Sequence, residues 1–199
     1  TRGPRDIDFI SAGSSVDGLN NLTPEQIHFL VHKIDELNSM YDFIIIDTGA
    51  GISDQVMEFV ASSSEIILVT TPEPTSITDS YSLLKALYKR KNFVPDNSRI
   101  KIIANKVTSR DDANIVYNKI NSVVMQFLKG KLEYLGYIPS DASVERAVRQ
   151  QQIVSICEPF SKASRAYDDI AEKLLGNEAT QNTVKKSIAH IFSSFLKKQ

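Results

Sequence analysis

The sequence predicts a doubly wound α/β domain, with a mainly parallel sheet flanked by helices, and three observations predict it. Apolar runs of strand length alternate along the chain with longer amphipathic segments, as in parallel sheets whose strands are joined by helices. Two of these runs, residues 43–46 and 66–69, are continuous and rich in β-branched residues, which predicts strands buried on both faces. The length of 199 residues and the hydrophobic content of 42% fit a globular domain with a substantial core.

The elements follow in a regular order. The predicted strands are residues 7–11, 41–47, 65–71, 100–105 and 131–138. Between the first two strands, a helix is predicted to begin at the N-cap Thr23, because Pro24 occupies the first helical position and apolar residues follow at helical spacing through Leu37. Further helices are predicted at residues 54–62, 76–90, 112–128, 143–150 and 161–175.

The helical pattern is predicted to break at Gly176, where the composition changes. We therefore expect residues 1–176 to form the α/β domain and residues 177–199 to form a linker and a separate amphipathic helix.

Composition and charge exclude several classes of protein. Lys and Arg number 23 against 24 Asp and Glu, so a globally basic nucleic-acid-binding protein is disfavoured. The single cysteine, Cys157, excludes an internal disulfide framework and is expected to pack as a small apolar side chain in a cytoplasmic protein. No apolar run is long enough to span a bilayer. The first residue is Thr1 and not Met, so we expect a processed product or a fragment.

The first candidate site follows the apolar run at residues 41–46. Asp47 comes directly after this run, at the predicted strand end where doubly wound sheets bind ligands. Its carboxylate is suited to holding Mg²⁺, directly or through water. Gly49, Ala50 and Gly51 form a small-residue turn whose backbone N–H groups can approach a phosphate closely. The alternative is that Asp47 caps the following helix.

Two further strand ends carry candidates for binding a nucleotide base. Asn105 offers an amide that can both donate and accept hydrogen bonds, although it could instead hold its own loop. The loop of Pro139, Ser140 and Asp141 could wall a base or a ribose. Asn105 is followed by Lys106, and GTPases with this Asn-Lys pair place an aspartate two residues after the lysine. The present chain has Thr108 there, so adenine is preferred over guanine.

The end of the sequence predicts a membrane-binding helix. Apolar residues recur on one helical face, and lysines flank them with no acidic residue after Glu178. This pattern is typical of a helix lying on anionic lipid, although the helix could instead dock on its own domain or in a groove of a partner protein. The residues concerned are Lys185, Lys186, Ile188, Ile191, Phe192, Phe195, Leu196, Lys197 and Lys198.

These motifs together carry a resemblance. The run at residues 41–52 resembles the switch II segment of the MinD/ParA family of P-loop ATPases, in the form seen in its flagellar branch, the FlhG, YlxH and FleN number regulators. Supporting matches lie at residues 71–75, 105–106, 136–139 and 147–152, in the same order and spacing.

The resemblance implies a switch protein that binds ATP and Mg²⁺, forms a homodimer around the nucleotide and attaches reversibly to the inner face of the cell membrane. It would control flagellar number or placement through the SRP-type GTPase FlhF and flagellar switch proteins. Asp47 would be the catalytic residue that supports Mg²⁺ and the attacking water. Gly49, Ala50 and Gly51 would sense the γ-phosphate, and Asn105 with the Pro139, Ser140 and Asp141 loop would contact adenine.

The chain departs from the family pattern in one respect. No Gly-x-x-x-x-Gly-Lys-Ser/Thr motif occurs in the 199 residues, so the chain alone is expected to have weak or absent nucleotide binding and little or no ATPase activity. The alternatives are a non-catalytic, membrane-associated adaptor, a relative that acts in chromosome partitioning or division-site selection, and a metabolic ATP-dependent ligase of the same superfamily.

Overall fold

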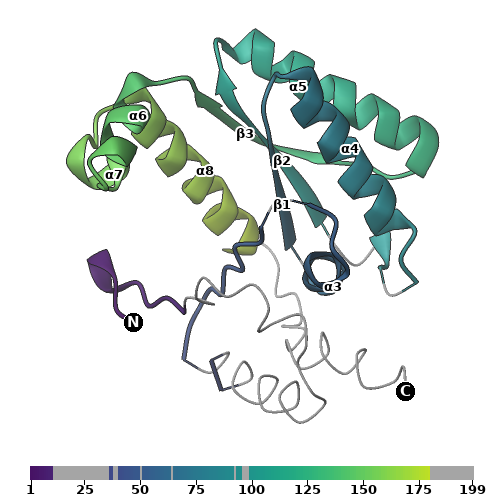
Figure 1. Cartoon of the computed structure of the whole chain (residues 1–199), viewed down its shortest axis with the longest axis horizontal. Coiled ribbons are helices and arrows are strands. Elements are labelled where there is room, and N and C mark those ends of the chain that lie inside the picture. Colours follow the sequence, from purple (N-terminus) through teal and green to yellow (C-terminus); the bar gives the residue numbers. More distant parts are fainter. Residues whose placement is uncertain are drawn as a thin grey trace. The chain divides into compact units, whose positions relative to one another are not determined.

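The computed structural model describes residues 1–10, 36–37, 40–49, 51–63, 65–91, 93–95 and 99–179. The chain divides into two compact units, one made of Thr1–Ile45 with Ser187–Gln199 and the other of Ile46–Lys186. The second unit holds the sheet and its helices, which are labelled in Figure 1. The predicted membrane residues between Lys185 and Lys198, and most of the helix predicted after Thr23, lie outside the described residues.

Three parallel strands form the sheet, in the order β1-β2-β3. They are β1 (Glu65–Thr70), β2 (Arg99–Val107) and β3 (Glu133–Pro139). Leu68 pairs with Ile102 across the first interface, and Ala104 pairs with Tyr137 across the second. The parallel α/β class that the sequence predicts is therefore confirmed, and so are these three strands.

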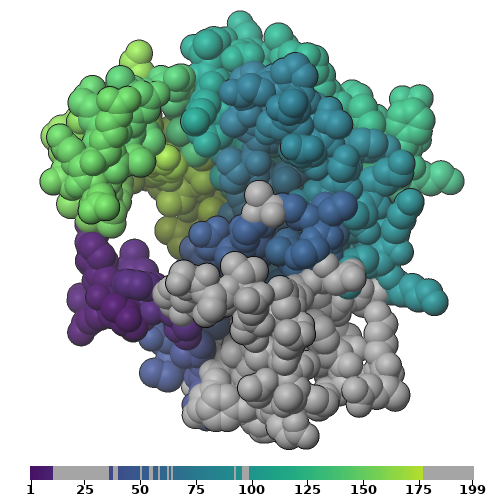
Figure 2. Space-filling view, viewed as in Figure 1, coloured from purple at the N-terminus to yellow at the C-terminus, as the bar shows by residue number. Residues whose placement is uncertain are grey.

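Helices cover both faces of this sheet, as Figure 1 shows for α4 and α5 on one side and α8 on the other. Successive residues of β2 enter different cores, because side chains alternate across a strand. Ile102 packs into the cluster beneath α4 and α5, whereas Ile103 packs into the cluster beneath α8. In the space-filling view, α4 and α5 form a continuous surface over their side of the sheet (Figure 2). The helices are α3 (Asp54–Ser62), α4 (Pro74–Tyr88), α5 (Arg110–Val123) with its π-helical continuation η3 (Val124–Leu128), α6 (Ala142–Arg149), α7 (Val154–Cys157) and α8 (Lys162–Ala179).

The expectation that residues 66–69 are buried on both faces is wrong. Ile66 and Leu68 are buried against the helices, but Ile67 and Val69 are 43% and 51% exposed. Alternating exposure of this kind marks a strand with a single covered face. The second helical layer, α8, packs on β3 and leaves that face of β1 open.

Two predicted strands do not form. Residues 41–47 make no ladder with any strand that the structure describes, and Ile45 is 88% exposed. Residues 7–10 contribute one isolated bridge, between Arg2 and Asp8, on either side of the short 3₁₀ turn η1 (Pro4–Asp6). β-Branched residues favour a strand only where a neighbouring strand completes the hydrogen-bond ladder, and the described residues supply none here.

Three smaller differences concern the C-terminal part. The four-residue helix α7 (Val154–Cys157) is not predicted, because a single turn is too short to show a period. It lies at the surface, so Cys157 is exposed and not packed in the core. Helix α8 continues through Gly176 to Ala179, so the predicted break at Gly176 is wrong, since one glycine costs a helix only about 1 kcal/mol. No helix among the described residues is long and apolar enough to cross a membrane.

Candidate functional site

The turn after β1 is fixed by one serine. The Ser76 hydroxyl lies 3.1 Å from the Thr70 hydroxyl and accepts a hydrogen bond of 3.0 Å from the Thr71 backbone N–H. Pro74 then occupies the first position of α4, where its fixed φ favours the helix. This turn lies beside the end of β2. A hydrogen bond from the Thr71 side chain, the backbone N–H of Glu73 itself and the positive charge of Lys106 lower the pKa of Glu73.

The end of β2 holds Asn105 in a defined orientation. The Asn105 side-chain carbonyl accepts a hydrogen bond of 2.9 Å from the Lys106 backbone N–H. Lys106 has a φ of 55°, which is uncommon for a residue other than glycine and is often found at functional sites. The Asn105 amide nitrogen has no hydrogen-bond partner among the residues that the structure describes, so this side chain presents donors. Asn105 therefore holds its own loop and also keeps two N–H groups for a ligand.

Thr108 occupies the position where GTPases carry an aspartate. Its backbone N–H and its hydroxyl both donate to Asp112, at 2.9 and 3.0 Å. Asp112 is thus engaged at the start of α5, where Ser109 is the N-cap. Residue 108 therefore offers a ligand no carboxylate, and its hydroxyl is bonded to Asp112.

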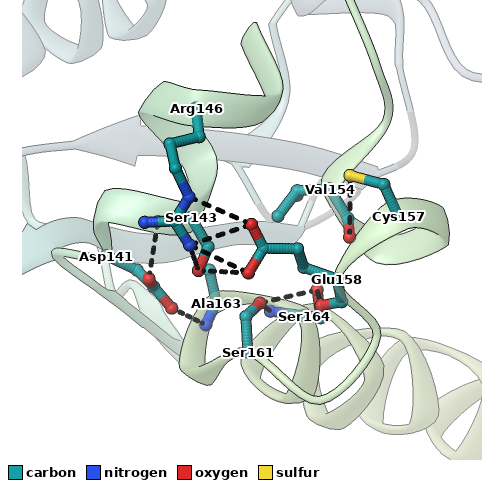
Figure 3. A network of polar contacts seen from close by, with 9 residues as sticks. All are labelled: Asp141, Ser143, Arg146, Val154, Cys157, Glu158, Ser161, Ala163 and Ser164. Carbon is teal, nitrogen blue, oxygen red and sulfur yellow. Dashed lines mark hydrogen bonds and ion pairs between the residues drawn. The ribbon is translucent and has the colours of Figure 1, made fainter. Parts of the chain in front are cut away.

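The loop after β3 begins next to the end of β2, since the Ser140 N–H donates to the Val107 carbonyl at 2.9 Å. Asp141 then binds the starts of two helices (Figure 3). One of its carboxylate oxygens accepts from the Ser143 N–H in α6 at 2.9 Å, and the other accepts from the Ala163 N–H in α8 at 3.1 Å. These hydrogen bonds lower the pKa of Asp141, and the bond from the Ser143 N–H contributes most. Of the three loop residues predicted to contact a ligand, Asp141 therefore has a structural role in this geometry.

A second carboxylate, Glu158, extends this network, and Figure 3 shows both carboxylates around Ser143. Glu158 accepts a hydrogen bond from the Ser143 hydroxyl at 2.8 Å and an ion-paired hydrogen bond from Arg146 at 2.9 Å. The Ser143 bond first, and Arg146 second, lower the pKa of Glu158. The Glu158 backbone carbonyl accepts from the Ser164 hydroxyl at 2.8 Å, which ties this segment to α8.

Sequence reasoning did not identify Ser143, Arg146 or Glu158. The N-cap pattern of Asp141, followed by Ser143 and Glu145, could have indicated the capping role of Asp141. The contact with Glu158 joins residues that are 15 positions apart, and no local pattern encodes it.

The predicted switch segment lies apart from these contacts. Asp47 and Gly49 are exposed, Ala50 lies outside the described residues, and Gly51 has a φ of 121°, which favours glycine. The N-cap of α3 is Ser53, whose hydroxyl accepts from the Val56 N–H, so Asp47 does not cap that helix. Among the described residues, no hydrogen bond or ion pair joins Asp47, Gly49 or Gly51 to Asn105 or to the loop after β3.

A groove of about 650 Å³ begins at the loop after β3 and continues along the outer side of that strand. Its lining includes Thr108, Pro139 and Ser140 at one end and side chains of α8 along its length. A parallel sheet with helices on both faces defines a doubly wound α/β fold, and ligands of such folds bind at the carboxyl ends of the strands.

Comparisons with known proteins are specific. The chain is 35% identical to the antiactivator FleN of Pseudomonas aeruginosa over 172 residues, which cover 86% of this chain and 60% of FleN. It is 32% identical to the flagellum site-determining protein YlxH of Helicobacter pylori over 143 residues, or 71% of this chain and 47% of YlxH. The chain thus spans about half to three fifths of the length of these relatives. No model of a protein family matches it.

Solved structures agree with these relatives. A ParA family ATPase from Chlorobium tepidum has a TM-score of 0.62 and 27% identity, covering 85% of this chain and 64% of that one. The septum site-determining protein MinD of Pyrococcus horikoshii, complexed with Mg-ADP, shares the fold with a TM-score of 0.57 and 22% identity, over 82% of this chain and 65% of that one. The chain belongs to the MinD/ParA family and is similar to its flagellar members FleN and YlxH.

Proposed function

We propose that this chain is the switch and base-binding part of a MinD/ParA-type ATPase that regulates flagellar number or placement. The observation that carries the proposal is Asn105 at a strand end, whose carbonyl is held by the Lys106 N–H while its amide nitrogen has no partner among the residues that the structure describes. Similarity to FleN and YlxH supports the flagellar role, and the Mg-ADP complex of the structural relative supports nucleotide and Mg²⁺ as the ligands.

Adenine fits the base site better than guanine does. The amide N–H groups of Asn105 complement acceptor ring nitrogens such as N7, which adenine and guanine share, so the choice between the two bases depends on residue 108. Guanine recognition of the GTPase type needs a carboxylate facing the N–H groups of the base. Thr108 stands in that place, and Asp112 is already engaged by Thr108. Pro139 and Ser140 would form the wall of the base site, while Asp141 holds that wall in place.

The Asp47 segment is proposed as the switch. Mg²⁺, when bound, would neutralise phosphate charge and polarise the phosphoryl group. Asp47 fits this ion because its carboxylate is exposed and does not cap α3. It would hold the ion through water and orient the attacking water, while the backbone of Gly49, Ala50 and Gly51 would contact the γ-phosphate. The 199 residues contain no phosphate-loop motif, so the proposal assigns no phosphate-binding lysine within them.

The partners and location are proposed from the same family membership. The protein would form a homodimer on ATP binding and act with the SRP-type GTPase FlhF and flagellar switch proteins. The ATPase-type domain would extend to the end of α8 at Ala179, and residues 180–199 would be the linker and membrane-targeting helix. The protein would then be cytoplasmic and bind reversibly to the inner face of the membrane.

Adenosine tests the base site without requiring phosphate binding. We expect adenosine at millimolar concentration to shift the side-chain amide resonance of Asn105 in a ¹⁵N-labelled sample, and guanosine to shift it less. The Asn105→Ala variant should lose the adenosine-dependent shifts of neighbouring residues. Asn118→Ala, which removes an exposed amide on α5, is the matched control and should retain them.

Equal shifts in the two variants would contradict the base site. The absence of a phosphate-loop motif from these residues favours a second candidate, the non-catalytic adaptor. An adaptor would show no adenosine response in the unmodified chain, so the same titration separates the two candidates.

A further inference from the structure

The groove along the outer side of β3 has a second property, which is its charge. Four cationic side chains line it: Arg110 from α5 and Lys162, Arg165 and Lys173 from α8. Asp169 is the only acidic residue in the lining. None of the four cations forms an ion pair among the residues that the structure describes. Four cations against one carboxylate give this concave surface a net positive potential.

Helices α5 and α8 begin at Arg110 and Lys162, both of which line the groove. The partial positive charge of each helix start is already met by carboxylates of this chain, Asp111 and Asp112 in the first turn of α5 and Asp141 at the start of α8. The positive potential of the groove therefore comes from its side chains.

The edge of β3 itself is not available for ordinary strand pairing. Leu135 is an extra residue in the ladder, because Ile102 pairs with Tyr134 and Ile103 pairs with Gly136. Its carbonyl accepts a hydrogen bond of 3.0 Å from the Lys173 ammonium, and Pro139 at the strand end has no N–H to donate. A bulge, a lysine and a proline on an edge strand all oppose the addition of another strand. Recognition in this groove would therefore depend on side-chain charge.

We propose that this groove, defined by Arg110, Lys162, Arg165 and Lys173, binds an extended acidic segment of a partner protein. Its lining follows β3 from Tyr134 to Ser140, so it is elongated, which suits a peptide of several residues better than a compact ion. Lys173 is held against the strand by the Leu135 carbonyl and keeps two further N–H donors for a carboxylate. The groove shares Pro139 and Ser140 with the wall of the base site proposed above, but the inference rests on the four cations, which are not part of that site.

The test measures fluorescence anisotropy of a fluorescein-labelled ten-residue peptide of alternating Glu and Ala, with the full chain in low-salt buffer. We expect the peptide to bind, and the double variant R110E/R165E to bind it about tenfold more weakly, because two attractive charges become repulsive. The milder R110Q/R165Q should show a smaller loss. Lys173 is left unchanged because it bonds to the strand.

The matched control is K91E/K119E, which changes the net charge equally at two exposed lysines outside the groove lining. It should change the affinity by less than about twofold. No binding of the acidic peptide, or equal losses in the groove and control variants, would overturn the proposal. A labelled oligonucleotide that binds more tightly than the peptide, with the same dependence on Arg110 and Arg165, would also overturn it in favour of a nucleic-acid surface.

Discussion

Among single residues, Lys101 is the charged side chain that the described core buries, with 2% exposure. It lies on the central strand β2 and forms an ion pair with Glu65 on the neighbouring strand β1. Glu65 also pairs with the partly exposed Arg99. A buried charge is tolerated only when it is paired, so Glu65 compensates a charge that the core could not otherwise hold.

Because Glu65 pairs with both Lys101 and Arg99, substitutions of Glu65 and of Lys101 should lower the free energy of unfolding by unequal amounts. Glu65→Ala should lower the free energy of unfolding by about 3 kcal/mol, because it leaves the Lys101 ammonium buried and uncompensated. Lys101→Met should cost less, roughly 1 kcal/mol, since Glu65 keeps Arg99 as a partner. Urea unfolding followed by circular dichroism measures both, with the exposed Glu172→Ala as the control. A larger loss for Lys101→Met than for Glu65→Ala would contradict this account.

Asp141 predicts a pH dependence. Its pKa lies below the ordinary value of 3.8, because the native state holds the ionised form with hydrogen bonds from Ser143 and Ala163. The resulting stabilisation is complete above pH 3.8 and is lost as the pH falls through the lower native pKa. Asp141→Asn should therefore be less stable than the unmodified chain by roughly 1 kcal/mol at pH 7, since one amide oxygen cannot serve both helices.

Below the native pKa of Asp141, the stabilities of the two proteins should converge. Urea unfolding from pH 7 to pH 2.5 measures the difference, with Ser140→Ala as a control for changes in the same loop. A constant difference across this range would show that the charge of Asp141 does not hold the two helices.

For single residues, the sequence predicts where a side chain lies along its strand or loop better than it predicts what that side chain contacts. Asn105 lies near the end of a strongly patterned strand, so its place there is predictable from the sequence. The roles of Asp141 and Lys101 depend on partners far along the chain, Ala163 and Glu65, which a local pattern does not reveal.

Among the helices and strands, the predictions are confirmed where the partners that an element packs on or pairs with are also among the described residues. The three strands of the sheet and helices α3 to α6 and α8 are found near their predicted positions, because caps and periodicity are local signals. Residues 41–47 have an equally strong pattern but no strand. Their hydrophobicity predicts burial, whereas strand formation depends on a partner that the pattern does not specify.

Substitutions of two glycines, Gly136 in β3 and Gly176 in α8, are predicted to have opposite effects on stability. A Cβ at Gly136 would lie 3.1 Å from Ile170 Cγ1, so Gly136→Val should push α8 from the sheet and cost about 2 kcal/mol. Gly176 lies within α8 with open space around its Cβ position, so Gly176→Ala should stabilise by roughly 0.5–1 kcal/mol. Thermal unfolding of both variants measures this. A stabilising Gly136→Val would show that α8 does not pack as closely as the structure indicates.

For the whole molecule, the proposed membrane attachment predicts that vesicle binding depends on the C-terminal residues. Deletion of residues 184–199 should abolish co-sedimentation with vesicles that contain anionic lipid, because it removes both the apolar face and the four lysines. The control is a variant with Lys185, Lys186, Lys197 and Lys198 changed to Gln, which should bind these vesicles more weakly while retaining the apolar face. Unchanged co-sedimentation after the deletion would contradict the membrane role of these residues.

The carboxylate of Asp141 also has a consequence for how this region opens. Because one side chain bonds the first turns of both α6 and α8, a movement that withdraws the Asp141 carboxylate frees both helix starts at once. The amide hydrogens of Ser143 and Ala163 should then exchange with solvent deuterium at one common free energy of opening, as members of a single cooperative unit. The loop of Pro139 and Ser140 would loosen in the same event, so the wall of the proposed base site and the packing of α8 would be lost together.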